Sequence, residues 1–429
     1  MTTDTESTDT ESTDADERLR RFARSRRFLL GRPRDLAFAS GRLLFLRALG
    51  ADDPVTGLWS LDPATGEERL LADPRALLGG EPEVIPAAER RRRERMRETA
   101  RGIVAYTVDT AGRRAAFALS GRLFTSDLGV DLDRDDQGRG VIREIPVAGP
   151  CVDPQLSPDG NAVAWLAGRA LRVTGLDGRV LLELSDQDPQ VSFGAAEFGA
   201  AEEMSRHHGC WWSPDGQRLL VAGVSEHDVA SWWLSDPSDA ATEPVHQRYP
   251  FAGTANPKVR LLLVGLDGSA TGVDVPTDEL PYLLAVRWGP AGLLLVLHTR
   301  DHGRSEIRAV DPQTGTTRLV RADTDPDWLE LTPGTPRFLG DGRLLHVADS
   351  EDTHRLVIGD EPVTPPGLQV ISVAGTAGET TIFCATTEPV ERHVYSLDHR
   401  TGEITRLSGE PGLHSAVADG ALLAISSET

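Results

Sequence analysis

Three glutamates in one short segment are the residues whose type and spacing best suit a chemical task. Residues 193–209, FGAAEFGAAEEMSRHHG, carry Glu197, Glu202 and Glu203, and no β-branched residue interrupts the segment. We therefore expect a short helix here. Adjacent carboxylates repel each other unless a cation lies close by. A pair of them could hold an ammonium group through charge-assisted hydrogen bonds, although a solvated helix face has the same composition.

The other reactive side chains give weaker signals. His207 and His208 could ligate a metal, but two neighbouring histidines alone are a poor metal motif. Cys151, Cys210 and Cys384 are too few and too far apart for a zinc site or a disulfide framework. The nucleophile-elbow pattern G-x-S-x-G does not occur in the sequence. We therefore predict no catalytic residue, no metal and no cofactor.

A repeated strand pattern must position the acidic helix. Apolar runs of four to eight residues alternate with turns of two kinds, an Asp-x-x-x-Gly unit and an SPDG unit. The turn units recur roughly every 40–65 residues, which is the size of a four-stranded propeller blade. A β-sandwich is the alternative, but seven copies at this period favour an all-β propeller of about eight blades. The clearest copies are at 61–70, 157–160, 213–216, 310–319 and 397–407.

The eighth unit is expected to be incomplete. Residues 414–429 hold two strands' worth of sequence and then the chain stops. An unfinished blade exposes a strand edge and apolar surface. Residues 18–47 could supply the missing strands, the chain could be a fragment of something longer, or a partner could complete the blade.

The charge pattern of the N-terminal region differs from that of the repeat. Residues 1–17 carry seven acids and no base, so we predict a disordered tail. Residues 18–33 form a basic lead-in, and residues 34–429 form the propeller. The start resembles no secretory signal and no apolar run is long enough to span a membrane, so we expect a cytoplasmic protein that does not contact a membrane.

The overall charge argues against one class of partner. The net charge is −21, with 66 acidic against 45 basic residues, which disfavours binding to nucleic acid. The seven arginines of residues 89–101 predict a short exposed helix, with a solvated surface favoured over a partner contact.

The segment from Ala196 to Gly265 resembles a known family. The acidic helix, the run CWWSPDG and the run YPFAGTANPKV follow each other in the order found in the N-terminal β-propeller of the dipeptidyl peptidase IV group, within the prolyl oligopeptidase superfamily of serine peptidases. The blade repeats extend this likeness, less specifically, over most of residues 30–425.

The resemblance implies a role for the acidic helix. In that family an eight-bladed propeller caps an α/β-hydrolase, and paired glutamates hold the free N-terminal amine of the peptide. The matching positions are Glu202 and Glu203, whereas Ala201 stands where many relatives have a third glutamate. Family members also place a propeller arginine on the substrate carbonyl. Its position stays open here, with Arg47 as a candidate.

The chain departs from the family in its chemistry. No α/β-hydrolase pattern follows the propeller, so we expect no peptide hydrolysis by this chain alone. The first interpretation is a substrate-recognition and gating propeller of a dipeptidyl-peptidase-type protein. Its partners would be short peptides with a free N-terminus and a separately encoded hydrolase. The alternatives are a non-catalytic scaffold propeller and a truncated gene fragment.

Overall fold

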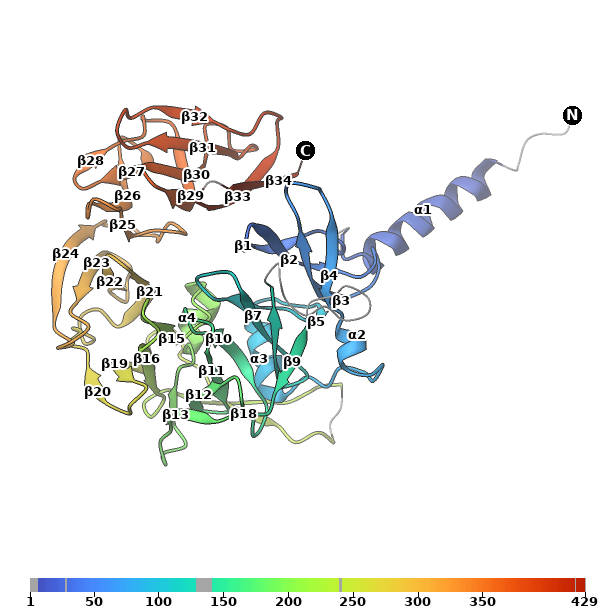
Figure 1. The fold of residues 1–429 in the computed structure, drawn as a ribbon, viewed down its shortest axis with the longest axis horizontal. Helices are drawn as coiled ribbons and strands as arrows, with labels where there is room; N and C mark the ends of the chain where they lie inside the picture. The colour runs from blue at the N-terminus through green and yellow to red at the C-terminus, as the bar shows by residue number, and fades with distance from the viewer. Residues whose placement is uncertain (1–6, 28, 129–140, 239–240, 421, 429) are drawn as a thin grey trace, which may run out of the picture. The chain divides into compact units, whose positions relative to one another are not determined.

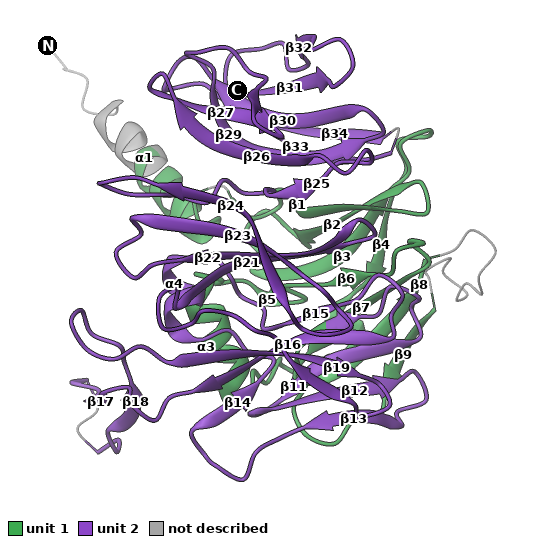
Figure 2. Cartoon of the chain, turned by 90° about the vertical axis from the view of Figure 1, so that its left-hand side faces the viewer, with its two compact units in different colours: residues 1–154 green, residues 155–429 purple. Residues whose placement is uncertain are grey.

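The computed structural model describes the chain except for residues 1–6, 28, 129–140, 239–240, 421 and 429. The described residues form an all-β propeller built from consecutive antiparallel sheets, with four helices between or before them (Figure 1). The chain divides into two compact units, residues 1–154 and 155–429, coloured separately in Figure 2.

Two sheets make up the strands of the first unit. The first runs in the order β1-β2-β3-β4, with β5 pairing in parallel to β3, and the second runs in the order β6-β7-β8-β9. Leu46, Leu58 and Phe117 belong to the apolar core of this unit. The strands are β1 (Arg34–Ala39), β2 (Arg42–Ala48), β3 (Val55–Leu61), β4 (Glu68–Ala72), β5 (Arg101–Gly102), β6 (Thr107–Val108), β7 (Arg114–Leu119), β8 (Arg122–Asp127) and β9 (Ile142–Ile145).

The second unit continues the series with four-stranded meanders. They begin with β10 (Val152–Leu156), which starts just before the unit boundary, followed by β11 (Ala162–Ala167), β12 (Ala170–Gly175) and β13 (Val180–Leu184). The next sheet contains β14 (Val191–Phe193), β15 (Cys210–Trp212), β16 (Arg218–Ser225), β19 (Lys258–Gly265) and β20 (Ala270–Gly272). Between β16 and β19 the chain forms a separate hairpin, β17 (Ser231–Leu234) and β18 (Val245–Arg248), with Trp232 and Trp233 exposed.

Three further meanders and one pair of strands complete this unit. They are β21 (Tyr282–Gly289), β22 (Gly292–His298), β23 (Arg304–Val310) and β24 (Thr317–Thr324); β25 (Arg337–Phe338), β26 (Leu344–Ser350), β27 (Thr353–Ile358) and β28 (Glu361–Pro362); β29 (Gln369–Ala377), β30 (Thr380–Thr386), β31 (His393–Asp398) and β32 (Ile404–Arg406); and β33 (Leu413–Asp419) with β34 (Leu422–Glu428). Neighbouring sheets share apolar clusters, so each sheet buries a face against the next.

The described part of the chain therefore holds seven sheets of four or more strands and a last sheet of two. This confirms the predicted propeller and the incomplete final blade. Residues 34–48, which could have supplied its missing strands, form β1 and β2 of the first sheet instead.

The turn units close the hairpins through local hydrogen bonds. In the second SPDG unit the Ser213 hydroxyl accepts from the backbone N–H of Arg218 at 3.0 Å and donates to the Asp215 carboxylate at 2.5 Å. Hydrogen bonds from Ser213 and from the Gln217 amide lower the pKa of Asp215. Each unit thus supplies its own turn-closing contacts, which is why the pattern is readable in the sequence.

The helices differ from the sequence expectations in two places. Helix α1 (Ser7–Arg24) includes part of the stretch predicted to be disordered, and its exposed Asp16–Arg20 and Glu17–Arg24 ion pairs place acids before bases along the helix dipole. The domain boundaries at residues 17 and 33 stay a prediction. None of the helices in the described part of the chain combines the length and apolar character that crossing a bilayer requires.

Helix α3 (Ala87–Arg95) is the second difference, because it is not simply exposed. Glu89 and Arg93 are buried, and Arg93 bridges the carboxylates of Glu89 and Glu83 at 2.8 and 2.9 Å. Arg92 also pairs with Glu89, at 2.9 Å. One face of this arginine-rich helix is therefore an internal ion-pair network, and only the other face is solvated. A third helix, α2 (Pro74–Leu77), is one short turn capped by Asp73.

Candidate functional site

The acidic segment forms an excursion from the edge of a sheet. Strands β14 and β15 both pair with β16, at Phe193↔Gly223 and Cys210↔Val221. They therefore occupy one edge of the sheet as two halves of an interrupted strand. Residues 194–209 leave between the two halves, and this excursion carries the predicted helix.

Glycines form the neck of the excursion. The Gly194 amide donates to the Ala222 carbonyl at 2.9 Å, and the Ala222 amide donates to the Gly209 carbonyl at 2.8 Å. A bridge between Ala195 and His208 closes the loop. A Cβ at Gly209 would lie only 2.4 Å from the Ala195 carbonyl oxygen, so no larger residue fits without moving the backbone.

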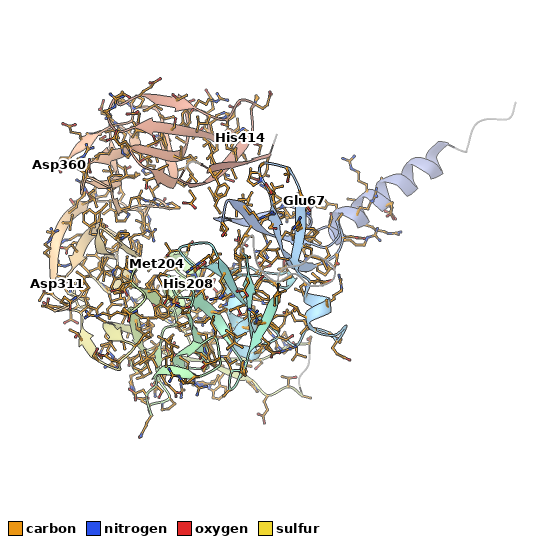
Figure 3. The ribbon with its side chains drawn as sticks, in the orientation of Figure 1. Glu67, Met204, His208, Asp311, Asp360 and His414 are labelled. Carbon is orange, nitrogen blue, oxygen red and sulfur yellow. The ribbon has the colours of Figure 1, made fainter. Side chains whose placement is uncertain are left out.

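Helix α4 (Phe198–Glu203) presents the predicted acidic pair in its last turn. Glu202 is half-buried and Glu203 is exposed, so the structure brings the two predicted residues together on one short helix. Successive helical residues point about 100° apart, so the two side chains reach a ligand from different directions rather than facing each other. Met204, just after the helix, packs against the apolar cluster between β21–β24 and β25–β28 (Figure 3).

The third glutamate of the segment has a different role. Glu197 and Arg206 are both buried, at 7% and 6% exposure, and form an ion pair across the excursion. Arg206 also donates to the carbonyls of Leu283 in β21 and of His208, each at 2.8 Å. This clamp ties both ends of α4 to each other and to the next sheet. Sequence reasoning missed Arg206, because its partner lies nine residues away and its carbonyl acceptor lies on another sheet.

The two histidines of the segment do not form a metal site with other ligands. His208 lies within hydrogen-bond distance of the Gln155 amide, Nδ1 to Nε2 at 3.2 Å, and Trp212 donates to the Gln155 carbonyl at 3.0 Å. His208, labelled in Figure 3, thereby joins the neck to β10 through its contact with Gln155. In the described residues no group of three or more His, Cys, Asp or Glu side chains is arranged to hold a metal ion.

Arg47, the candidate for the substrate-carbonyl arginine, is engaged with its own sheet. It forms a two-point ion pair with Glu68, at 2.6 and 3.2 Å, and its guanidinium lies 4.3 Å from the centre of the Trp59 ring. These contacts account for the position of the Arg47 side chain by interactions within the first sheet.

One group with the connectivity of a catalytic triad was not anticipated. His393 hydrogen-bonds through Nδ1 to Ser408 at 2.9 Å and through Nε2 to Glu391 at 2.8 Å. Ser408 and His393 are buried, and the Ser408 hydroxyl also accepts from the Val394 amide at 3.1 Å. The His393 ring stacks on His414, with centroids 5.2 Å apart. A buried serine held by a backbone amide is placed to join strands rather than to attack a substrate.

Comparison with known proteins agrees with this architecture. Residues 127–425 match the family model described as the dipeptidyl peptidase IV (DPP IV) N-terminal region. The structure resembles that of Porphyromonas gingivalis dipeptidyl peptidase 4, with a TM-score of 0.69 and 18% identity, over 91% of this chain and 55% of that one. At this identity the structural likeness shows the fold alone.

Relatives of known sequence point the same way. The chain is 26% identical over 314 residues to the probable dipeptidyl-aminopeptidase B of Aspergillus oryzae, covering 62% of this chain and 34% of the relative. It is 28% identical over 170 residues to the inactive dipeptidyl peptidase 10 of Rattus norvegicus, covering 38% and 21%. The match thus spans about a third of the length of the Aspergillus relative and about a fifth of the length of the rat relative. Since the family model covers well over half of its residues, the chain belongs to the dipeptidyl peptidase IV N-terminal region family.

Proposed function

We propose that this chain is the substrate-recognition and gating propeller of a dipeptidyl-peptidase-type protein. In this proposal Glu202 and Glu203 bind the free N-terminal amine of a short peptide. The observation that supports it most is the placement of the pair on a short helix that leaves a sheet edge and is clamped by Glu197 and Arg206. Glu203 is exposed, so packing in the core does not explain why a carboxylate stands at this position.

The chemistry of the pair suits an α-ammonium group. Two adjacent carboxylates supply acceptors for its three N–H donors, and the positive charge relieves their mutual repulsion. The clamp limits movement of the helix, so little conformational entropy is lost when the ligand binds. An N-acetylated peptide offers neither the charge nor the donors.

A second candidate is a binding propeller with no catalytic role in any assembly. This candidate is supported by the similarity to a relative named inactive dipeptidyl peptidase 10. The two candidates differ in one measurable property. A recognition propeller should increase peptide turnover when it is mixed with a matching α/β-hydrolase domain, whereas a scaffold should bind the peptide without affecting turnover.

Calorimetric titration of the chain with an Xaa-Pro dipeptide and with its N-acetylated twin tests the proposal. We expect binding of the free-amine peptide only, and its loss in the double variant Glu202→Gln/Glu203→Gln. Because Glu202 is half-buried and Glu203 is exposed, each charge contact should contribute about 0.5–1 kcal/mol, so the double variant should bind about five- to thirtyfold more weakly.

A matched control separates site chemistry from net charge. Glu351 and Asp352 are another adjacent, exposed acidic pair in the same unit. Glu351→Gln/Asp352→Asn removes the same two charges and should leave binding unchanged. Equal binding of both peptides by the unaltered chain would contradict the role of the acidic pair.

A further inference from the structure

The interface between the sheets β21–β24 and β25–β28 changes character along its length. Leu294, Val296 and His298 follow each other on one face of β22, and Leu344 and His346 lie on the opposing face of β26. The leucines and Val296 belong to one apolar cluster. His298 and His346 continue these two rows and are almost completely buried, at 1% and 2% exposure. Apolar residues would be expected at both positions, because alternate residues of a strand share one face.

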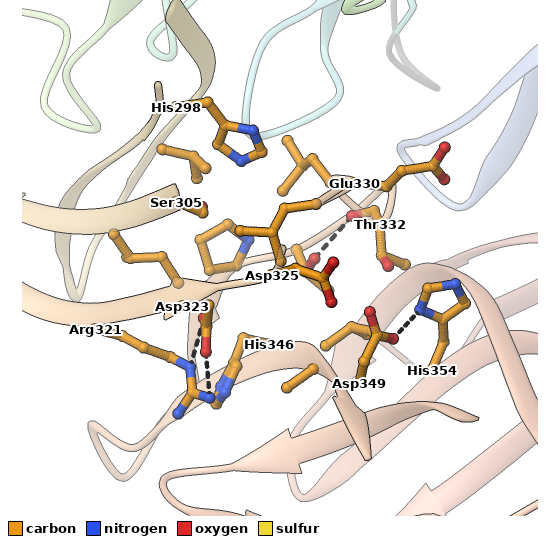
Figure 4. A pocket seen from close by; sticks show the side chains of 18 of the residues that line it. His298, Ser305, Arg321, Asp323, Asp325, Glu330, Thr332, His346, Asp349 and His354 are labelled. Atoms are coloured by element: carbon orange, nitrogen blue, oxygen red, sulfur yellow. Dashed lines mark hydrogen bonds and ion pairs between the residues drawn. The ribbon is translucent and has the colours of Figure 1, made fainter. Parts of the chain in front are cut away.

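A cavity of about 160 Å³ lies where the apolar rows give way to the two histidines. Its lining includes both imidazoles, Ser305, and the segment that links β24 to β25. Figure 4 shows His298, His346 and the carboxylates of Asp325 and Asp349 around this space. The volume is enough for a ligand of a few heavy atoms and too small for a peptide.

His346 points to an occupant with polar groups. Both of its ring nitrogens are buried and neither makes a well-aligned hydrogen bond in the described structure, although the Leu344 backbone acts against the lowering of its pKa. Burial, and then the nearby Arg321 guanidinium, lowers the pKa of His346 to about 4. The ring is therefore neutral near pH 7 and offers one N–H donor and one acceptor nitrogen. A buried polar group without a hydrogen-bond partner destabilises the folded state, so an occupant that supplies a partner is favoured.

The charges around the cavity select the sign of that occupant. Four carboxylates line it against one guanidinium, that of Arg321, which forms a two-point pair with Asp323 at 2.6 and 2.8 Å. Asp349 pairs with His354. Asp325 accepts from the backbone amides of Asp327 and Trp328, at 2.8 and 3.0 Å. Asp325 thus lines the cavity, and the described residues include no cationic side chain that forms an ion pair with it.

We propose that this cavity binds a small organic cation with N–H donors, either a primary ammonium or a guanidinium group. Asp325 supplies the countercharge, and the imidazole of His346 accepts a hydrogen bond. A metal ion is not the expected occupant, because no cluster of three metal-ligating side chains is arranged for one in the described residues.

The covering segment gives the cavity a defined rim. Trp328 stacks on His302, with ring centres 4.1 Å apart, and the Leu329 amide donates to the His302 carbonyl at 2.9 Å. These contacts hold the segment after Asp325 in place, so the site is preformed and selects its ligand by size.

Titration of the ¹⁵N-labelled chain with propylammonium chloride tests the proposal through the imidazole resonances. His346 is assigned by its loss in His346→Leu, a change that extends the apolar row from Leu344. We expect a saturable shift of His346, and a parallel titration with methylguanidinium distinguishes the two kinds of cation. Propionamide, a neutral molecule of similar size, should give no shift, and sodium chloride sets the baseline for ionic strength.

Asp325→Asn isolates the charge. The asparagine oxygen can keep both backbone hydrogen bonds of the turn, so the fold is retained, and affinity should fall at least about tenfold. Asp311→Asn is the matched control, because Asp311 also caps a turn, accepting from Gln313 at 2.8 Å, outside the cavity. If propionamide shifts His346 as much as the amines do, the cavity does not select a cation, and if Asp325→Asn binds normally, Asp325 does not supply the countercharge. Either result, or the absence of a saturable shift with both cations, would show that the proposal is wrong.

Discussion

The clamp between Glu197 and Arg206 makes the sharpest stability prediction. Replacing Arg206 with methionine keeps much of the side-chain volume and removes every charged hydrogen bond. The Glu197 carboxylate then stays buried without its partner, and the carbonyls of Leu283 and His208 each lose a 2.8 Å donor. Breaking a buried ion pair on one side costs about 3–5 kcal/mol, whereas an exposed pair costs about 0–1 kcal/mol. Because the side chains of Arg206 and Glu197 are only 5% and 6% exposed, the larger range applies.

Urea unfolding followed by tryptophan fluorescence measures this cost. The Trp211 ring centre lies 5.9 Å from the Arg206 guanidinium carbon, so one of the eight tryptophans that contribute to the signal is beside the clamp. We expect Arg206→Met to lower the free energy of unfolding by about 3–5 kcal/mol. In Glu197→Gln/Arg206→Met no unpaired charge is left, so the double variant should be more stable than Arg206→Met by about 1–3 kcal/mol.

Two results would refute this reasoning. One is a loss below about 1 kcal/mol for Arg206→Met, which would place the pair in solvent. The other is a double variant less stable than Arg206→Met, which would mean that the buried carboxylate is satisfied without the arginine. The same variants measured by peptide titration separate a weakened clamp from a lost acidic pair, since Arg206→Met leaves Glu202 and Glu203 in place.

Three other changes test the rest of the structure. Arg93→Met leaves Glu83 without its cation, whereas Glu89 keeps its ion pair with Arg92, so the change should cost about 3 kcal/mol in urea unfolding. Arg91→Met on the exposed face of α3 should stay within about 0.5 kcal/mol. Gly209→Ala forces the neck apart and should cost about 1–3 kcal/mol, with peptide binding reduced as well. The pKa of His346 is lowered in the folded chain, so the unfolded state binds more protons between pH 6.5 and 4. The free energy of unfolding of the unaltered chain should therefore fall on acidification through this range, by about 3 kcal/mol more than that of His346→Leu. Identical pH profiles for the two proteins would refute the lowered pKa of His346.

Features with local causes were readable from the sequence. The SPDG and Asp-turn units close through contacts within about five residues, as the Ser213 hydroxyl shows by bonding the Arg218 amide. The alternation of turns and short apolar runs therefore predicted the series of sheets and the two-stranded last sheet. The helix carrying Glu202 and Glu203 was predicted for the same reason, since helix-forming residues fill the segment without interruption.

Features that depend on distant partners were not readable. The burial of Glu89 and Arg93 requires Glu83 and the packing beneath α3, so charge density alone predicted a solvated helix. The placement of His298 and His346 around one cavity depends on how two sheets pack, which no local pattern encodes. Each histidine alone looks like an ordinary strand residue.

The geometry of the excursion explains how a short helix can be inserted into a blade with little disruption of its sheet. Phe193 and Cys210 pair with positions only two residues apart on β16, and Ala222 between them bonds both neck glycines. The ladder of the sheet is therefore almost continuous across the insertion. Because the neck and the clamp hold the helix in place, the residues on the exposed face of α4 can vary without loss of these contacts. The residues that hold the helix and those proposed to bind the peptide are thus different sets.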